Sequence, residues 1–150
     1  MRDASRIVPL ADGHHVWTRR VGESKTKLLL LHGGPGFNHE YLEIFADYLP
    51  QHGVELYFYD QLGPNEFLVT GNFKDWDRWA DLHRLQMPTL LLVGQHDTMA
   101  VEDIEEMGQR IPNSHVTVCP NGSHMAMWDN ADIYFASLLH FVDSVETGGK

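Results

Sequence analysis

The sequence predicts an α/β fold: a mostly parallel sheet with helices on both faces and an antiparallel hairpin at its N-terminus. Short apolar runs alternate along the chain with stretches in which apolar residues recur at helical spacing. The apolar runs are uninterrupted, as in strands that are buried on both faces. Strands that alternate with helices indicate parallel pairing, because parallel neighbours need a long crossover connection.

The first half of the chain contains a predicted hairpin, two further strands and one helix. Residues 5–9 and 14–21 flank an Ala-Asp-Gly turn, which predicts the hairpin. Four leucines at 28–31 predict a buried strand that leads into a glycine-rich turn. Residues 41–51 place their apolar side chains on one helical stripe. Residues 55–59 form the next apolar run, which ends at an aspartate.

The second half continues the alternation. Residues 75–85 are predicted to be helical, and 89–93 form the third buried strand. A helix over 101–111 carries acidic residues near its N-terminus, where the helix dipole favours negative charge. Residues 116–119 are the last strand, and 131–145 form an amphipathic helix. Its side chains expected to face the core are Phe135, Leu138, Leu139, Val142 and Val145.

Size and charge exclude several classes of protein. A chain of 150 residues suffices for one domain, with an N-terminal sheet half at 1–63 and a C-terminal half at 64–150. Asp and Glu number 21 against 11 Lys and Arg, which argues against a nucleic-acid partner. No apolar run is long enough to span a membrane, and the single cysteine, Cys119, cannot form an internal disulfide. These features favour a cytoplasmic location.

Chemically capable groups follow each predicted parallel strand. Gly33 and Gly34 follow the first strand, Asp60 the second, Asp97 the third and His124 the last. In parallel sheets, functional groups gather beyond the carboxyl ends of the strands. A carboxylate after one strand can orient a histidine after the next, which is the acid–base half of a catalytic triad. The N–H groups of a glycine-rich turn can stabilise a developing oxyanion.

The sequence leaves the nucleophile open, because no Gly-x-Ser-x-Gly occurs in it. Ser123 adjoins His124, but adjacent side chains usually diverge, so attack would need the histidine of a partner chain, or the histidine would activate a water. Ser24 matches only a bare Ser-x-x-Lys in a polar link. Cys119 has the context of a small buried residue. Asp60 is a further, carboxylate candidate.

Several segments resemble the proline iminopeptidases (prolyl aminopeptidases), a serine peptidase family of the α/β-hydrolase superfamily. They are His32-Gly33-Gly34-Pro35-Gly36, Tyr59-Asp60-Gln61-Leu62-Gly63, Gly63-Pro64-Asn65-Glu66-Phe67, Gly94-Gln95-His96-Asp97 and Gly122-Ser123-His124. The resemblance implies that Asp97 is the triad carboxylate and His124 the triad base. It implies that Gly33 and Gly34 belong to the oxyanion loop. Glu66 takes the position of a glutamate that helps to hold the substrate's free amine.

The resemblance also implies a large internal deletion. Gly63 runs directly into residues 64–67, which in the family lie late in a helical cap, so the serine elbow and most of the cap are absent. The two flanks of the sheet then either rejoin or leave strand edges that pair with another chain, which favours a homo-oligomer.

The predicted function is a reduced α/β-hydrolase that acts on small esters or amides. The alternative is an inactive remnant that folds and self-associates. No cofactor is expected, and no His-x-x-x-His or Cys-x-x-Cys spacing supports a metal site.

Overall fold

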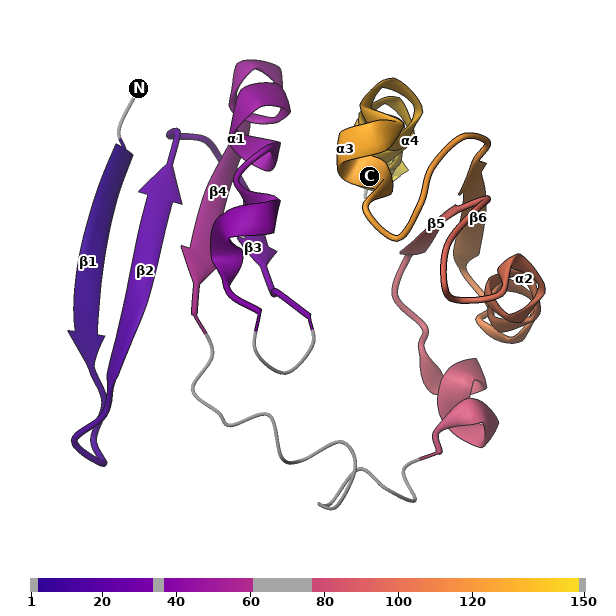
Figure 1. The fold of residues 1–150 in the computed structure, drawn as a ribbon, viewed down its shortest axis with the longest axis horizontal. Coiled ribbons are helices and arrows are strands. Elements are labelled where there is room, and N and C mark those ends of the chain that lie inside the picture. Colours follow the sequence, from indigo (N-terminus) through magenta and orange to yellow (C-terminus); the bar gives the residue numbers. More distant parts are fainter. Residues whose placement is uncertain (1–2, 34–36, 61–76, 149–150) are drawn as a thin grey trace. The chain divides into compact units, whose positions relative to one another are not determined.

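The computed structural model describes residues 3–33, 37–60 and 77–148, and the chain divides into two compact units, Met1–Trp76 and Asp77–Lys150 (Figure 1). The strands of the described residues pair into a four-stranded sheet and a two-stranded sheet. None of the helices in these ranges is long and apolar enough to cross a membrane.

The four-stranded sheet of the N-terminal unit has the order β1-β2-β4-β3. β1 (Asp3–Pro9) and β2 (His15–Val21) form the predicted antiparallel hairpin. β3 (Thr26–Leu30) runs parallel to β4 (Val54–Tyr59), and β4 runs antiparallel to β2. The sheet is therefore mixed, with the parallel pair that the apolar runs predict.

The segment between β3 and β4 forms short helices instead of the single helix predicted over 41–51. They are η1 (His39–Leu42), α1 (Phe45–Tyr48) and η2 (Pro50–His52). Proline lacks the N–H that would continue α1, and Gly53, at φ 76°, ends the segment in the left-handed region. The apolar stripe still contributes to the core, whose buried residues in this unit are Val21, Leu30, Leu42, Ile44, Phe45, Leu49, Val54, Leu56 and Phe58.

The prediction that β3 is buried on both faces is wrong. Leu30 is 7% exposed, but Leu29 is 58% and Leu31 is 61% exposed. Successive side chains of a strand point to opposite faces, so Leu29 and Leu31 face away from the side on which Leu30 meets the core. Among the described strands β3 pairs with β4 alone, which places it at an edge of the sheet.

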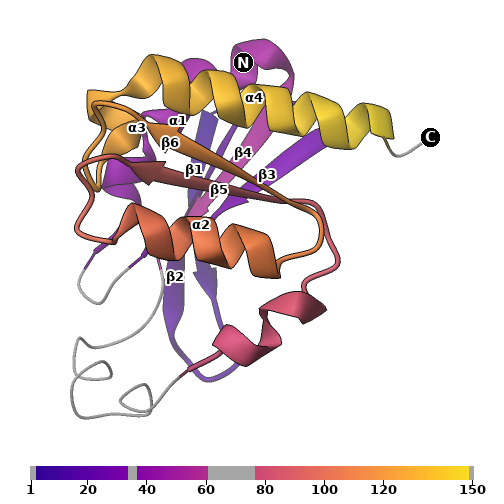
Figure 2. The ribbon, with the colours of Figure 1, turned by 90° about the vertical axis from the view of Figure 1, so that its right-hand side faces the viewer.

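The C-terminal unit is a parallel strand pair between helices. β5 (Thr89–Gly94) pairs with β6 (Ser114–Cys119). α2 (Val101–Arg110) lies on one side of this pair and α4 (Ala131–Gly148) on the other (Figures 1 and 2). The predicted alternation of strands and helices is confirmed here.

Two predictions for this unit need correction. The helix predicted over 75–85 is a 3-10 helix, η4 (Trp79–Arg84), and residues 75 and 76 lie outside the described ranges. α4 extends beyond the predicted end, and Val145 is 41% exposed instead of facing the core. Residues 143–148 are all exposed, so the last turns of the helix have no apolar surface to cover.

Candidate active site

The loops that follow β5 and β6 are joined by backbone hydrogen bonds. The N–H groups of Gln95 and His96 donate to the carbonyl oxygens of Cys119 and Gly122, each at 2.9 Å. Gly94 allows this approach, because a Cβ atom there would lie 2.2 Å from a carbonyl oxygen of the opposite loop. Glycine at the end of β5 is therefore required for the two loops to meet.

The joined loops bring Asp97 and His124 together. Nδ1 of His124 lies 2.9 Å from Oδ1 of Asp97. A proton on Nδ1 is donated to the carboxylate, which leaves the lone pair of the neutral ring on Nε2. The His124 side chain is 64% exposed, whereas that of Asp97 is 10% exposed. The arrangement is that of an accessible base with a sheltered orienting carboxylate.

Asp97 is held by further donors. Its Oδ1 accepts the N–H of Met99 at 3.0 Å and the hydroxyl of Thr98 at 3.3 Å. Burial alone would raise the pKa of Asp97, but the hydrogen bonds from Met99 and His124 outweigh it, and the pKa lies below its ordinary value. Asp97 is consequently ionised at neutral pH, which an orienting carboxylate requires.

Ser123 takes part in local structure at the start of α3 (Ala126–Asp129). Its hydroxyl donates to the Asp129 carboxylate and accepts the N–H of Met125 at 3.1 Å. Its own N–H donates to Asp129 Oδ1 at 3.1 Å. The hydroxyl proton of Ser123 is thus directed to Asp129. Attack by Ser123 would first require this contact to break.

The remaining predicted site residues belong to the N-terminal unit. Gly33 lies just beyond β3, and its N–H donates to the hydroxyl of Tyr41 at 2.6 Å. Gly34 and Glu66 lie outside the described residues. The oxyanion role of the two glycines and the amine-binding role of Glu66 stay predictions.

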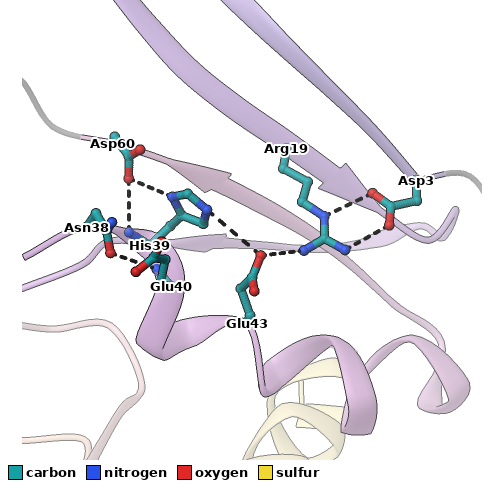
Figure 3. Close-up of polar contacts among 7 residues, drawn as sticks. All are labelled: Asp3, Arg19, Asn38, His39, Glu40, Glu43 and Asp60. Atoms are coloured by element: carbon teal, nitrogen blue, oxygen red, sulfur yellow. Dashed lines mark hydrogen bonds and ion pairs between the residues drawn. The ribbon is translucent and has the colours of Figure 1, made fainter.

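A second histidine–aspartate pair lies just beyond the carboxyl end of β4 (Figure 3). Asp60 Oδ1 lies 2.8 Å from Nδ1 of His39 and accepts the His39 N–H at 2.9 Å. The His39 ring stacks on Trp17 at a centroid distance of 3.6 Å, and its Nε2 faces Glu43 at 3.8 Å. The position of Asp60 after a strand is visible in the sequence, but nothing there pairs it with His39.

Two other candidate nucleophiles, Cys119 and Asp60, also lie within the described residues. Cys119 is fully buried, as its sequence context predicts, and burial raises the pKa of its thiol. One carboxylate oxygen of Asp60 is bound by both the backbone N–H and the ring of His39. In the part of the chain that the structure describes, no group of three or more His, Cys, Asp or Glu side chains could hold a metal ion.

Comparison with known proteins supports the resemblance. No family model matches the chain. The proline iminopeptidase of Saccharolobus solfataricus is 39% identical over 83 residues, which is 55% of this chain and 27% of that protein. The proline iminopeptidase of Chitinophaga pinensis is 58% identical over 50 residues, 33% of this chain and 17% of that protein. The chain is similar to proline iminopeptidases. In four of these curated relatives the match spans only 17% to 28% of the relative's own length.

Solved structures establish the fold of this proline-iminopeptidase-like chain. The proline iminopeptidase of Mycobacterium smegmatis superposes with a TM-score of 0.84 at 13% identity, covering 98% of this chain and 100% of that one. An esterase of Pyrococcus furiosus superposes with a TM-score of 0.73 at 10% identity, covering 95% and 90%. These neighbours have the α/β-hydrolase fold, and the predicted fold class is confirmed.

Proposed function

We propose that the chain is a proline-iminopeptidase-like hydrolase that cleaves small esters or amides with His124 as general base. The observation that carries the proposal is the contrast between its two histidine–aspartate pairs. His39 is 14% exposed and stacked on Trp17, and both of its ring nitrogens face carboxylates. His124 is 64% exposed, and Asp97 engages only its Nδ1. Access to Nε2 therefore distinguishes a working base from a structural pair.

The reaction proceeds through a water molecule in the simplest scheme. Nε2 of His124 accepts a proton from water as the water oxygen bonds to the carbonyl carbon and the carbonyl electron pair moves to oxygen. When this intermediate collapses, the alcohol or amine departs with the proton from Nε2. Asp97 remains ionised throughout and stabilises the imidazolium that forms between the two steps.

The charge of a hollow beside Asp97 bears on the choice of substrate. Its volume is about 680 Å³, and its lining includes Met99, Val101, Glu102 and Glu105. The apolar side chains suit an acyl group or a small alcohol, and the two glutamates disfavour anionic substrates by charge repulsion. Neutral or cationic esters and amides therefore suit this lining better than anionic ones.

Ester hydrolysis by purified variants tests the proposal. We expect His124→Ala to reduce turnover of 4-nitrophenyl acetate by about 100-fold or more, the usual contribution of a general base. His96→Ala is the matched control. His96 is exposed in the loop after β5, and in the described residues no side-chain contact links it to Asp97. Equal turnover in the two variants would show that the activity is only that of exposed imidazoles.

A fluorophosphonate probe with peptide mapping distinguishes the two possible nucleophiles. Labelling of Ser123 that disappears in His124→Ala supports a serine nucleophile released from Asp129. Ester turnover without labelling supports the water mechanism.

We propose as a second candidate that the chain has no turnover and acts as a self-associating domain. The exposed edge strand β3 favours this function, because Leu29 and Leu31 present an apolar surface beside an unpaired strand edge in the described sheet. Absence of esterase activity above buffer, together with a stable oligomer, is the expected outcome under this alternative.

A further inference from the structure

We propose that Asp129 is a positioning residue for His124, acting through Ser123, which directly precedes the histidine in the chain. In this role, which rests on the proposed function of His124 as general base, the Asp129 carboxylate holds the loop that carries the base and does not touch the reacting atoms. All of the residues involved belong to the C-terminal unit.

The Asp129 carboxylate binds both hydrogen-bond donors of Ser123. The Ser123 N–H donates to Oδ1 at 3.1 Å and to Oδ2 at 3.2 Å, and the hydroxyl donates to Oδ2. Hydrogen bonds to an ionised acceptor are stronger than those between neutral groups. Ser123 is therefore fixed through its backbone as well as its side chain, which sets the direction in which the chain enters His124.

The residue that follows His124 is fixed by the same cluster. The N–H of Met125 donates to the Ser123 hydroxyl oxygen at 3.1 Å. Since that hydroxyl gives its proton to Asp129, one side chain connects the peptide groups on both sides of His124. The backbone of His124 is thus held by both of its neighbours, while its ring extends to Asp97 at 2.9 Å.

Asp129 is carried by a helix that is itself packed. Its N–H donates to the carbonyl oxygen of Met125 at 3.2 Å. α3 packs against α4, and both Ala126 of α3 and Phe135 of α4 are buried. A Cβ atom at Gly122 would lie 2.8 Å from that of Ala126, so glycine lets the loop approach α3 closely. The Asp129 carboxylate therefore ties the loop to a fixed element.

Loss of this tie has a consequence for the base. A catalytic group must be held within about 0.5 Å of its productive position by the contacts of its neighbours. Without Asp129, water can satisfy the donors of Ser123, but it cannot tie the loop to α3. His124 then leaves Asp97 for part of the time, and the proton of its neutral ring moves between Nδ1 and Nε2.

We expect Asp129→Ala to lower kcat for 4-nitrophenyl acetate about tenfold, less than the 100-fold that a displacement of about 1 Å can cost. KM should change little, because the base acts in the chemical step and the lining of the hollow beside Asp97 is unaltered. Asp129→Asn should lose less, since its amide oxygen can still accept the Ser123 N–H.

Asp143→Ala is the matched control. Asp129 and Asp143 are both exposed, so neither substitution buries an unpaired charge, and we expect both variants to fold. Asp143 lies on α4 and should keep the wild-type kcat when it is replaced.

A spectroscopic readout tests the position of the base independently of activity. Long-range 15N–1H spectra of the whole chain, recorded where imidazole is neutral, report which ring nitrogen carries the proton, and His124→Ala identifies the signals of His124. In the wild type we expect the proton on Nδ1, directed at Asp97. Asp129→Ala should show both tautomers, and Asp129→Asn an intermediate mixture. A residue that only stabilised the fold would leave the tautomer of the folded chain unchanged.

The outcomes distinguish the role of Asp129 from the proposed function. A folded Asp129→Ala with lower kcat, retained KM and mixed tautomers at His124 supports the positioning role. In an active background, an unchanged kcat or an unchanged tautomer overturns it and leaves the proposed hydrolase intact. A rise in turnover also overturns it, because the carboxylate would then only restrain Ser123.

Two further results are decisive. If Asp129→Ala does not fold, Asp129→Asn takes its place, and wild-type kcat and tautomer in that variant overturn the positioning role. A wild type without turnover contradicts the proposed function itself, and the catalytic role of Asp129 falls with it even if the tautomer changes.

Discussion

Asp97 combines a structural role in its loop with the catalytic role that we propose for it. It is nearly buried, and it accepts hydrogen bonds from Met99, Thr98 and His124. These bonds favour its ionised form more than burial opposes it, so its pKa is lower in the folded chain. The same charge that holds the loop in place orients the imidazole of His124.

Asp97→Asn is predicted to lower ester turnover about as far as His124→Ala, on the order of 100-fold or more, because an amide cannot stabilise the imidazolium. Steady-state kinetics on a neutral ester checks this. Asp143→Asn, at an exposed position on α4, should keep wild-type turnover. Full activity in Asp97→Asn would contradict the role of Asp97 in orienting the base.

The same substitution has a pH-dependent effect on stability. Because the folded pKa of Asp97 lies below its ordinary value, its stabilising contribution is complete above that ordinary value and is lost as the pH falls through the lowered pKa. Urea unfolding at pH 7 should therefore show a wild type more stable than Asp97→Asn, with a smaller difference near pH 3. A difference that grows on acidification would contradict this assignment.

Only some residues and contacts of the candidate site could be predicted from the sequence. Asp97 and His124 could be named because each follows a strand within a recognisable motif. The engagement of Ser123 with Asp129 could not, since it depends on how the chain turns into α3. The pairing of His39 with Asp60 joins residues from separate elements and leaves no local pattern.

Among the elements, β4 is a mostly apolar strand that contains one buried charged residue, Glu55. Glu55 is fully buried and accepts hydrogen bonds from the Tyr57 hydroxyl, the Ser24 N–H at 3.0 Å and the Lys27 ammonium at 2.9 Å. The guanidinium of Arg20 pairs with Oε1, the oxygen that the Tyr57 hydroxyl also binds, whereas Ser24 and Lys27 bind Oε2. Led by the Tyr57 and Ser24 hydrogen bonds, these donors lower the pKa of Glu55 well below its ordinary value despite burial.

Glu55→Gln is predicted to destabilise the N-terminal unit more than Asp47→Asn, an exposed control on α1, because Arg20 and Lys27 lose the buried carboxylate with which they pair. The folded pKa is lowered, so the advantage of the wild type is present at neutral pH and shrinks as the pH falls below the ordinary glutamate value. Thermal unfolding followed by tryptophan fluorescence at several pH values measures it. A constant difference across that range would contradict the prediction.

The contact between the loops that follow β5 and β6 depends on a single residue, Gly94. Gly94→Ala would place a methyl group 2.2 Å from the carbonyl oxygen of Ser123, which forces the loops apart. We expect a loss of about 1–3 kcal/mol in the free energy of unfolding and a fall in esterase activity. Gly148→Ala is the control, since a Cβ atom there meets nothing within 4 Å. Denaturant unfolding and ester kinetics on both variants are the measurements, and unaltered activity in Gly94→Ala would show that the loop contact is dispensable.

Whether a segment forms a strand or a helix could largely be predicted from the sequence. Which of its faces is covered by other elements could not. The apolar runs predict the strands because burial of their side chains is local information. The division between α1 and η2 falls at Pro50, whereas the apolar stripe gives no sign of the earlier division between η1 and α1. The exposure of Leu29 could not be predicted, because it depends on which other element covers that face of β3.

For the whole molecule, the two edges of the four-stranded sheet differ in protection. β1 carries the Asp3–Arg19 ion pair and ends at Pro9, features that discourage pairing with another strand. β3 is five residues long, contains no proline, and presents Leu29 with Leu31 just beyond its end. In the described sheet its outer edge has no strand partner. An unprotected apolar edge favours pairing with a second copy of the chain.

We therefore predict that the chain is a homo-oligomer whose contact includes β3. Light scattering coupled to size-exclusion chromatography should give at least twice the monomer mass. Leu29→Lys should shift the population toward monomer, because a charge at the centre of the contact disfavours edge pairing. Ile7→Lys is the matched control, since Ile7 is 60% exposed on β1 and Leu29 is 58% exposed on β3. A monomeric wild type contradicts self-association, and equal masses in the two variants would place the contact away from β3. If Leu29→Lys is a folded monomer that retains esterase activity, His124 and Asp97 act within one chain and need no partner subunit.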